Sequence, residues 1–459
     1  MNLLVRRRVL RDRLAGALWV LPTVSVVIFL AAGALLSRVS IGDDSPLRAL
    51  AFQGTADDAR ALLIVVSTTM ITVTGLVFAL TIVALQIASG QYSPRLLRNF
   101  MRDRGTQLVL SVFVGAFAYS TAGLYTVGVQ RSGQQTFVPR LAVSGSLALA
   151  LASVGVLIYF IHHLAHSIQI DTIMSQIQRE TCEVIDDVYP DPTSDGQPEE
   201  RCPDPPPWAT VLPATSSGYL QAIEPAPLVE VAGRHDLVVR LARRVGDHVV
   251  AGTPIAWVWH QSPNQPPPEP AMLSEAVADA VQVGFERTMV QDVLFGLRRL
   301  VDTANRALSP AINDPYTAVQ AVHHLAVLLC ILARRQLGDR LCRDGQGILR
   351  VAIPLPDFAE YLVRSTAQIR RFGAAEPALT RSLIELLRDV GSLAVSDDRR
   401  AACARHLRLV LEDAKRETAQ PADLHAVLED GAAALSALGT DHSQGVAAQR
   451  AFPQDGHGH

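Results

Sequence analysis

Charge is absent from four long stretches of this chain. Residues 14–37, 61–88, 107–129 and 141–161 contain no Asp, Glu, Lys, Arg or His. Each stretch is long enough to cross a bilayer, which takes about 20 residues, although the first also resembles a signal peptide with a long apolar core. Proton relays, voltage sensors and many ion-coupled transporters need an ionisable group within the membrane. The absence therefore argues against a coupled pump, but not against a passive channel.

Lysine and paired cysteines are also scarce. Lys415 is the single lysine among 41 basic residues, which suggests a GC-rich bacterial genome and says little about chemistry. The five cysteines are odd in number, all lie after Ile161, and none is spaced C-x-x-C. This pattern indicates reduced thiols in a cytoplasmic domain and argues against a disulfide framework.

Familiar catalytic and metal-binding motifs are missing. The chain has no phosphate-binding P-loop, no G-x-S-x-G, no H-E-x-x-H, no EF-hand loop and no Cys/His set with zinc spacing. His162 and His166 are four residues apart, but no acidic residue or cysteine lies beside them until Asp171. We expect these histidines to be interfacial anchors. The sequence predicts no catalytic residue, no metal and no cofactor, and hence no enzyme.

The charge that is present divides the chain in two. Up to Ile161 there are 14 Arg and 6 Asp, a net charge of +8; from His162 onward, 27 basic and 38 acidic residues give −11. An apolar, basic first part followed by an acidic, more polar second part argues against a simple soluble enzyme. It also argues against a nucleic-acid binder.

Arginine placement predicts the orientation of the apolar runs. Five Arg precede the first run, and four lie in the loop after the second, at 95–104. Cytoplasmic loops carry an excess of basic residues. We therefore expect both segments, both termini and the large second part in the cytoplasm, with the four runs in the bacterial inner membrane.

The second run carries a small and polar face. Its flanks differ, because Ser67, Thr74 and Thr81 lie on one side and larger apolar residues on the other. Two interpretations remain open: close helix packing, or a hydrated pore or substrate face. At 100° per residue, the face brings five residues within about 60° of one another: Thr68, Thr72, Gly75, Ala79 and Gln86.

Small residues four apart in the last two runs predict helix packing. Ser111 and Gly115 form such a pair in the third run, and Ser144, Ala148 and Ala152 form such a series in the fourth.

After the fourth run, a helix is expected to continue to about residue 188, followed by a Pro-rich linker. Residues 209–260 then predict short strands. The pattern from Val245-Gly246-Asp247 to Ile255 is similar to the second half of a barrel-sandwich hybrid domain, the fold of biotinyl and lipoyl carriers. Carriers are modified on a lysine, and this segment has none. We therefore predict a structural or oligomerisation module.

The rest of the second part is expected to be mainly helical. Ser309-Pro310 and Asp314-Pro315 each join a preferred N-cap residue to a proline, so a turn followed by a helix from Pro315 is predicted. A helix N-terminus beside arginines can hold an anion, although a solvated, ion-paired face is the other interpretation. The candidate anion or ligand site comprises Arg299, Arg306, Asn313 and Asp314. A strand at 347–353 and helices at 356–372, 377–390, 397–413 and 421–438 complete the prediction.

Two motifs connect the chain to a known family. The stretch TGLVFALTIVALQIASGQYSPRLLRNFMRDRGTQ (74–107) and ALSPAINDPYTA (307–318) resemble the bacterial predicted membrane proteins called domain of unknown function 2254. The resemblance runs from the first apolar run to near Gly439. It implies a multi-pass membrane protein with a cytoplasmic C-terminal part, and brings no established activity or catalytic residue.

Together these features predict four transmembrane helices plus a cytoplasmic α+β region with a small barrel-sandwich-like module and a helical C-terminal domain. The first function hypothesis is an oligomeric passive channel or facilitator for ions or small solutes, with a cytoplasmic assembly or gating domain. The alternative is a membrane-tethered cytoplasmic sensor or scaffold for a ligand or protein partner. The expected partners are the lipid bilayer and further copies of the chain. The expected domain limits are 1–161 for the transmembrane helices and 162–207 for the connecting helix and Pro-rich linker. The barrel-sandwich-like module is expected at 208–261, the helical domain at 271–438 and a disordered tail at 439–459.

Cysteine labelling tests the predicted orientation. An impermeant thiol reagent added outside the cell should label Asp43→Cys and Arg131→Cys, because their loops follow the first and third runs. Labelling of Asn99→Cys or Gln346→Cys from outside would show that the orientation is wrong.

Overall fold

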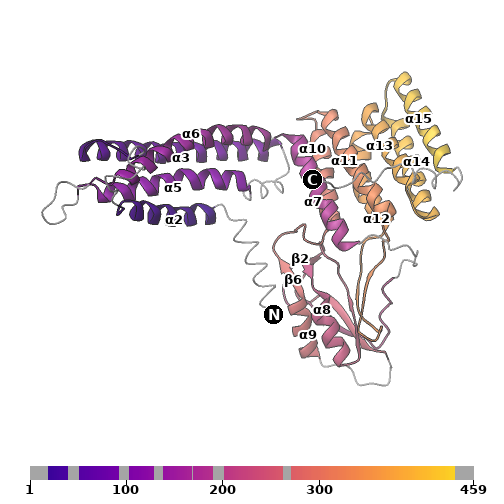
Figure 1. The fold of residues 1–459 in the computed structure, drawn as a ribbon. Helices are drawn as coiled ribbons and strands as arrows, with labels where there is room; N and C mark the ends of the chain where they lie inside the picture. Colours follow the sequence, from indigo (N-terminus) through magenta and orange to yellow (C-terminus); the bar gives the residue numbers. More distant parts are fainter. Residues whose placement is uncertain are drawn as a thin grey trace, which may run out of the picture. The chain divides into compact units, whose positions relative to one another are not determined.

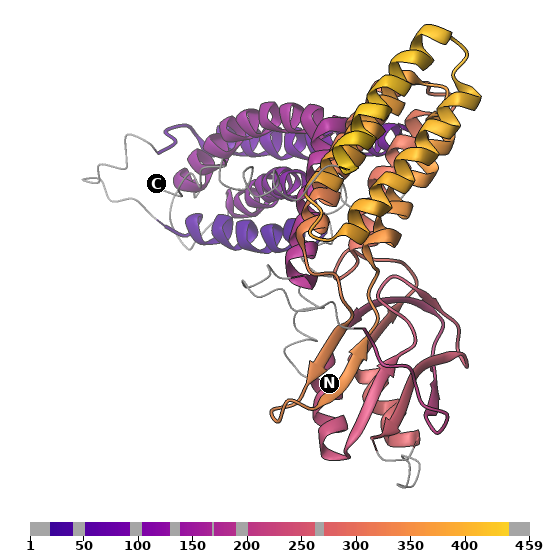
Figure 2. The ribbon, with the colours of Figure 1, turned by 90° about the vertical axis from the view of Figure 1, so that its right-hand side faces the viewer.

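The computed structural model describes residues 19–39, 51–91, 103–128, 138–167, 169–189, 201–261 and 270–439. The chain divides into two units, Met1–Thr172 and Ile173–His459, whose elements are drawn in Figures 1 and 2. The tail expected at 439–459 lies outside the described residues except for Gly439, and so does most of the Arg-rich loop at 95–104. The domain limits expected from the sequence stay predictions.

The first unit is a bundle of four apolar helices with α5 in its middle (Figure 1). Helix α5 contacts each of the other three. Of its most apolar 18 residues, 56% are buried, against 28% for α3 and 22% for α6. The four helices are α2 (Val20–Leu36), α3 (Ala56–Gln91), α5 (Arg104–Thr126) and α6 (Arg140–Ser167).

Helices α2 and α5 run in the same direction. Near their starts, the Ser25 hydroxyl donates a hydrogen bond to the Ser111 carbonyl at 2.7 Å. Near their ends, Gly33 lies against the backbone of Tyr119, so closely that a Cβ there would come within 2.7 Å of the carbonyl oxygen. The close approach needs glycine, and it fixes the two helices side by side.

Helices α3 and α6 run opposite to α5. Leu63, near the start of α3, lies beside Gly123 at the end of α5. His163, near the end of α6, bonds Asp103 at the start of α5, with 2.7 Å between Nε2 and Oδ2. The four helices therefore alternate in direction along the chain. The chain enters α2 and leaves α6 at the same end of the bundle.

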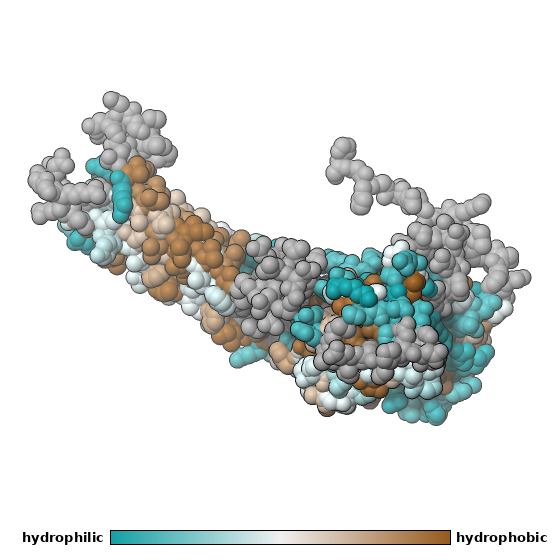
Figure 3. All heavy atoms as spheres, turned by 90° about the horizontal axis from the view of Figure 1, so that it is seen from below, coloured by the Kyte–Doolittle hydropathy of each residue, from teal (hydrophilic) through white to brown (hydrophobic). Residues whose placement is uncertain are grey.

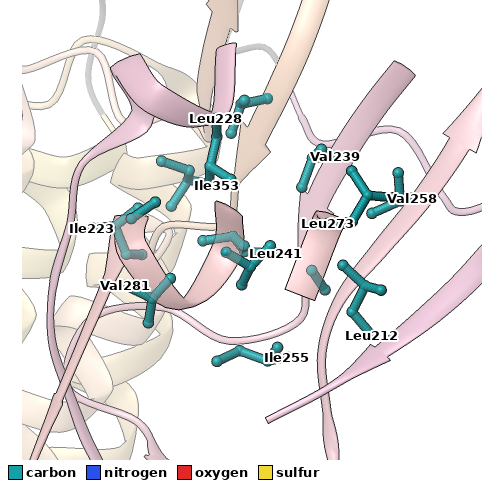
Figure 4. Packing of buried hydrophobic residues seen from close by; sticks show 14 of the residues in the cluster. Leu212, Ile223, Leu228, Val239, Leu241, Ile255, Val258, Leu273, Val281 and Ile353 are labelled. Carbon is teal, nitrogen blue, oxygen red and sulfur yellow. The ribbon is translucent and has the colours of Figure 1, made fainter. Parts of the chain in front are cut away.

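The second unit contains two sheets, which share a buried apolar core with helices α8 (Pro225–Arg234) and α9 (Pro270–Ala280). Figure 4 shows part of this core. In the larger sheet β3 and β8 are parallel and the other neighbours are antiparallel. Its strand order is β1 (Thr210–Pro213), β5 (Pro254–His260), β3 (Leu237–Leu241), β8 (Leu349–Ile353) and β7 (Arg340–Arg343); the smaller sheet is β4 (His248–Val249), β2 (Gly218–Ile223) and β6 (Val281–Gly284).

The expected short strands are present, but the barrel-sandwich module at 208–261 is not confirmed. Helix α8 interrupts the strands, and β6, β7 and β8 join the sheets from outside that segment. A tight turn is present at Gly246, whose φ of +94° is a backbone conformation that favours glycine. The sequence located strands, but it did not predict which distant strands would pair with them.

Helices make up the remainder of the second unit. The helix starts expected at Asp314 and Asp357 are confirmed, because their carboxylates accept a backbone N–H in the first turn, at 3.1 and 2.7 Å. The Asp292 carboxylate caps α10 in the same way, at 3.0 Å, which the sequence did not predict. Ser309-Pro310 forms a turn between helices. The helices are α7 (Ile170–Val188), α10 (Val293–Ala307), α11 (Pro315–Arg334), α12 (Phe358–Gly373), α13 (Pro377–Ser392), α14 (Asp397–Glu417) and α15 (Pro421–Gly439).

Four described helices are long and apolar enough to cross a membrane: α3, α5, α6 and α11. The first three confirm predicted runs. The first predicted run appears as α2, whose 17 residues fall short of that length within the described part of the chain. Helix α11 was not predicted to be a span. It packs against α10 and α13 and buries Leu325, Leu328 and Leu332, as an apolar helix inside a protein core also does.

Helix α7 is anchored in the second unit by close packing and by polar contacts. A Cβ at Gly296 of α10 would come within 2.2 Å of the Thr181 hydroxyl of α7. Arg299, only 3% exposed, donates to Glu180 at 2.9 Å. Only two residues separate the end of α6 from the start of α7. The boundary between the two units falls within the first turn of α7.

Replacing Gly296 tests this anchor. Gly296→Leu should destabilise the second unit by about 1–3 kcal/mol, because the side chain would overlap Thr181. Gly233→Leu is the matched control, since a Cβ at that helical glycine meets no atom within 4 Å. Thermal unfolding of the purified variants gives the comparison. Equal midpoints for Gly296→Leu and Gly233→Leu would contradict the packing described.

Candidate functional site

The small, polar stripe of α3 lies on the outside of the bundle. Thr68, Thr72, Gly75, Ala79 and Gln86 are all exposed. A Cβ placed on Gly75 would meet no atom within 4 Å. The stripe therefore packs against no described helix of its own chain. If it is a packing face, its partner is a helix of another copy.

The opposite face of α3 makes the packing contacts. Leu63, Val66, Met70 and Val77 are buried there. Ser67, which the sequence placed on the flank of the stripe, is buried as well, and its hydroxyl lies 3.2 Å from that of Thr121 on α5. The helix thus has one face for its own bundle and a chemically different face directed outward.

Hydroxyl groups of the stripe bond back to their own helix. Thr72 donates from Oγ1 to the carbonyl of Thr68 at 2.8 Å. Thr74 and Thr81, on the flank, make the same bond to the carbonyls four residues earlier. The three hydroxyl donors are satisfied in this way, and the exposed Thr72 hydroxyl keeps acceptor lone pairs for a partner outside the helix. Such a surface tolerates lipid and can also bind water or a cation.

Large apolar side chains adjoin the stripe. Val65, Leu76 and Val83 are 61%, 52% and 48% exposed. In Figure 3, hydrophobic residues gather over the apolar helices and hydrophilic residues dominate the surface of the second unit. The stripe is therefore a local interruption of a surface suited to lipid.

The last two runs differ in how they use their small residues. Gly115 of α5 lies against Phe29 and Ser25 of α2, as the packing expectation requires. In α6, Ala148 and Ala152 are exposed, and Gly155 has open space around it. Ala148, Ala152 and Gly155 therefore make no close packing within the described chain, whereas Ser144, the first residue of the predicted series, accepts a hydrogen bond from the Phe52 backbone N–H at 2.8 Å.

The end of the bundle near His163 contains a polar contact that the sequence analysis missed. The Asp103 carboxylate caps α5 by accepting from the backbone of Gly105 and Thr106, and it also bonds His163. Tyr159 stacks on the His163 ring with centroids 5.5 Å apart. Asp103 lies four residues before the third run, where an N-cap residue is readable from the sequence, whereas its partner 60 residues away is not.

The pair of histidines noted in the sequence lies on one helical face. The rings of His162 and His166 are 4.2 Å apart, and Nδ1 of His166 bonds the His162 carbonyl at 3.0 Å. Within the described ranges, no three His, Cys, Asp or Glu side chains are grouped to hold a metal ion.

The four residues of the candidate anion site have different roles in the structure. Arg299 is buried against Glu180 of α7. The Asp314 carboxylate caps α11 through the backbone and hydroxyl of Thr317, and Asn313 holds the left-handed φ of +49° that the turn requires. Arg306 follows Arg299 by two helical turns. Arg299, Asp314 and Asn313 therefore have structural contacts of their own, and the anion site stays a prediction.

A polar joint that no sequence pattern indicated connects the sheets with the helices in the second unit. Arg244 donates twice to Glu360, at 2.7 and 2.5 Å. Burial opposes ionisation of Glu360, but the hydrogen bonds and charge of Arg244 outweigh it and hold the pKa of that carboxyl below its usual value. Nearby, the Tyr189 and Tyr361 hydroxyls lie 2.9 Å apart, both buried. This joint links the segment after β3 to helix α12.

Comparison with known proteins is consistent with the bundle. A family model described as predicted membrane protein, domain of unknown function 2254, matches residues 15–389. An uncharacterized protein of Mycobacterium bovis and one of Mycobacterium tuberculosis are each 47% identical over 435 residues, covering 94% of this chain and 82% of the relative. No solved structure matches the chain. The chain therefore belongs to the predicted membrane protein family called domain of unknown function 2254.

Proposed function

We propose that this membrane protein is an oligomeric passive channel or facilitator for ions or small solutes. In this proposal the outward stripes of α3 from several copies surround the pathway. One observation carries it: Thr68, Thr72, Gly75 and Ala79 are exposed on a membrane helix whose own bundle contacts lie on another face.

A stripe of this kind gains little from facing lipid. Glycine and alanine offer few dispersion contacts to acyl chains, whereas small residues allow close approach to a second helix. The exposed amide of Gln86 would lose hydrogen bonds in hydrocarbon, at a cost of roughly 2–7 kcal/mol. A neighbouring copy or a water-filled path removes both disadvantages.

The proposed mechanism is passive because the apolar runs of the spans lack ionisable groups. The segment 61–88 contains no charged residue or histidine. Coupling to a proton or to membrane voltage needs such a group. Threonine hydroxyls and backbone carbonyls can instead replace part of a solute's hydration shell.

The second unit would assemble or gate the oligomer in the cytoplasm of a bacterial cell. The alternating helix directions support placing the chain ends of the bundle on one side, and the Arg-rich segments favour the cytoplasmic side. The anchoring of α7 by Arg299 and Gly296 offers a route by which the second unit could hold the end of α6.

Flux through reconstituted vesicles tests the proposal. Gly75→Leu and Thr72→Leu should lower flux about tenfold or more, because a bulky side chain removes space from the path, a change of at least about 1.4 kcal/mol in the barrier. Leu76→Phe is the matched control, since it changes the adjacent apolar flank. Size-exclusion chromatography with light scattering should show the same oligomer for all variants.

Two results would contradict the channel. The first is a well-assembled parent protein that passes no common cation, anion or small neutral solute. The second is loss of assembly in Gly75→Leu, which would show that the stripe only packs copies together. Either result would leave the membrane-tethered sensor or scaffold as the better proposal.

A further inference from the structure

A small cavity opens between α9 and two strands that stand at the edges of different sheets. Its volume is about 300 Å³, and it is bounded by β1, the residues after β1, β5, α9 and β6. Strands β1 and β6 each end their sheet. The cavity therefore lies where the two sheets fail to close on each other.

Apolar side chains form the floor of the cavity. Leu212, Ile255, Val277 and Val281 line it, and each is less than a tenth exposed. Figure 4 shows Leu212, Ile255 and Val281 on one side of the core cluster, each from a different strand. The floor is thus part of the folded core, and it does not depend on an exposed loop.

Neutral polar groups form the rim. Thr215, Ser216 and Ser274 contribute hydroxyls, and Gln282 contributes an amide. Among the described residues that line the cavity there is no Asp, Glu, Lys, Arg or His. A charged ligand would lose hydration without gaining a counter-charge, whereas a neutral ligand could exchange its water contacts for hydroxyl and amide partners.

The size limits the ligand further. Protein cores are packed to the density of organic crystals, with few voids larger than water. A cavity of 300 Å³ is at the lower end of the range for small-molecule sites. It suits one aromatic ring or a short branched chain, with a single polar group at the rim.

We propose that this cavity is a binding site for a small uncharged molecule that joins one apolar group to one amide, carbonyl or hydroxyl. The apolar group packs on Leu212, Ile255 and Val281, and the polar group bonds the rim hydroxyls. The site belongs to the second unit and does not depend on whether α3 conducts.

Photolabelling of the full-length protein in detergent tests the site. The probe is benzamide carrying an aryl diazirine, and the matched probe is the corresponding benzoate, which has nearly the same shape and a negative charge. The benzamide should label peptides containing residues 212–216 or 274–283, as identified by mass spectrometry. Excess unlabelled benzamide should prevent labelling. The benzoate probe should label these peptides at least about tenfold less than the benzamide probe.

Two variants of α9 complete the experiment. Ser274→Phe fills the rim and should abolish labelling, whereas Glu275→Phe adds the same side chain at an exposed position outside the cavity and should leave labelling intact. Thermal unfolding identifies a variant that does not fold, and Ser274→Leu then replaces it. Equal labelling of Ser274→Phe and Glu275→Phe, equal labelling by the two probes, or labelling spread over unrelated peptides would each overturn the proposal.

Discussion

Close approach to α5 is the constraint on which the membrane unit depends. Lipid tails are as apolar as leucine, so no hydrophobic force drives these helices together, and packing with interhelical hydrogen bonds has to hold them. Gly33 of α2 and Gly145 of α6 lie against Tyr119 of α5. The hydroxyls of Ser120 and Ser146 lie 2.7 Å apart between α5 and α6. Contacts with three helices explain why α5 has a larger buried share than α3 or α6.

The outward faces of α3 and α6 follow from that arrangement. Each of these helices packs its buried face against α5. The small residues on its exposed face therefore have no partner within the described bundle. Gly75 and Gly155 both stand in open space. A single chain thus offers surfaces that lipid fills poorly and that another copy could cover. This is the physical basis of the proposed assembly, and α7 would connect it to the second unit.

The sequence predicted features governed by local rules. Asp314 and Asp357 were readable as helix caps because capping depends on neighbours three residues away. Apolar runs were readable as spans, but α11, which is also long and apolar enough to cross a membrane, packs within the second unit. Pairing of β3 with β8 joins residues more than 100 positions apart, and no local pattern encodes it. The α3 stripe was visible from periodicity, but only the structure showed that it faces outward.

Water access along α3 tests the central claim most directly. In a functional background with the five native cysteines replaced, single cysteines at Thr72, Gly75, Ala79, Leu76 and Val83 would be exposed to a charged, water-soluble thiol reagent in assembled, reconstituted protein. The account predicts modification at Thr72→Cys, Gly75→Cys and Ala79→Cys, and protection at Leu76→Cys and Val83→Cys. Protection at all five positions, or modification without this periodicity, would contradict a hydrated pathway along α3.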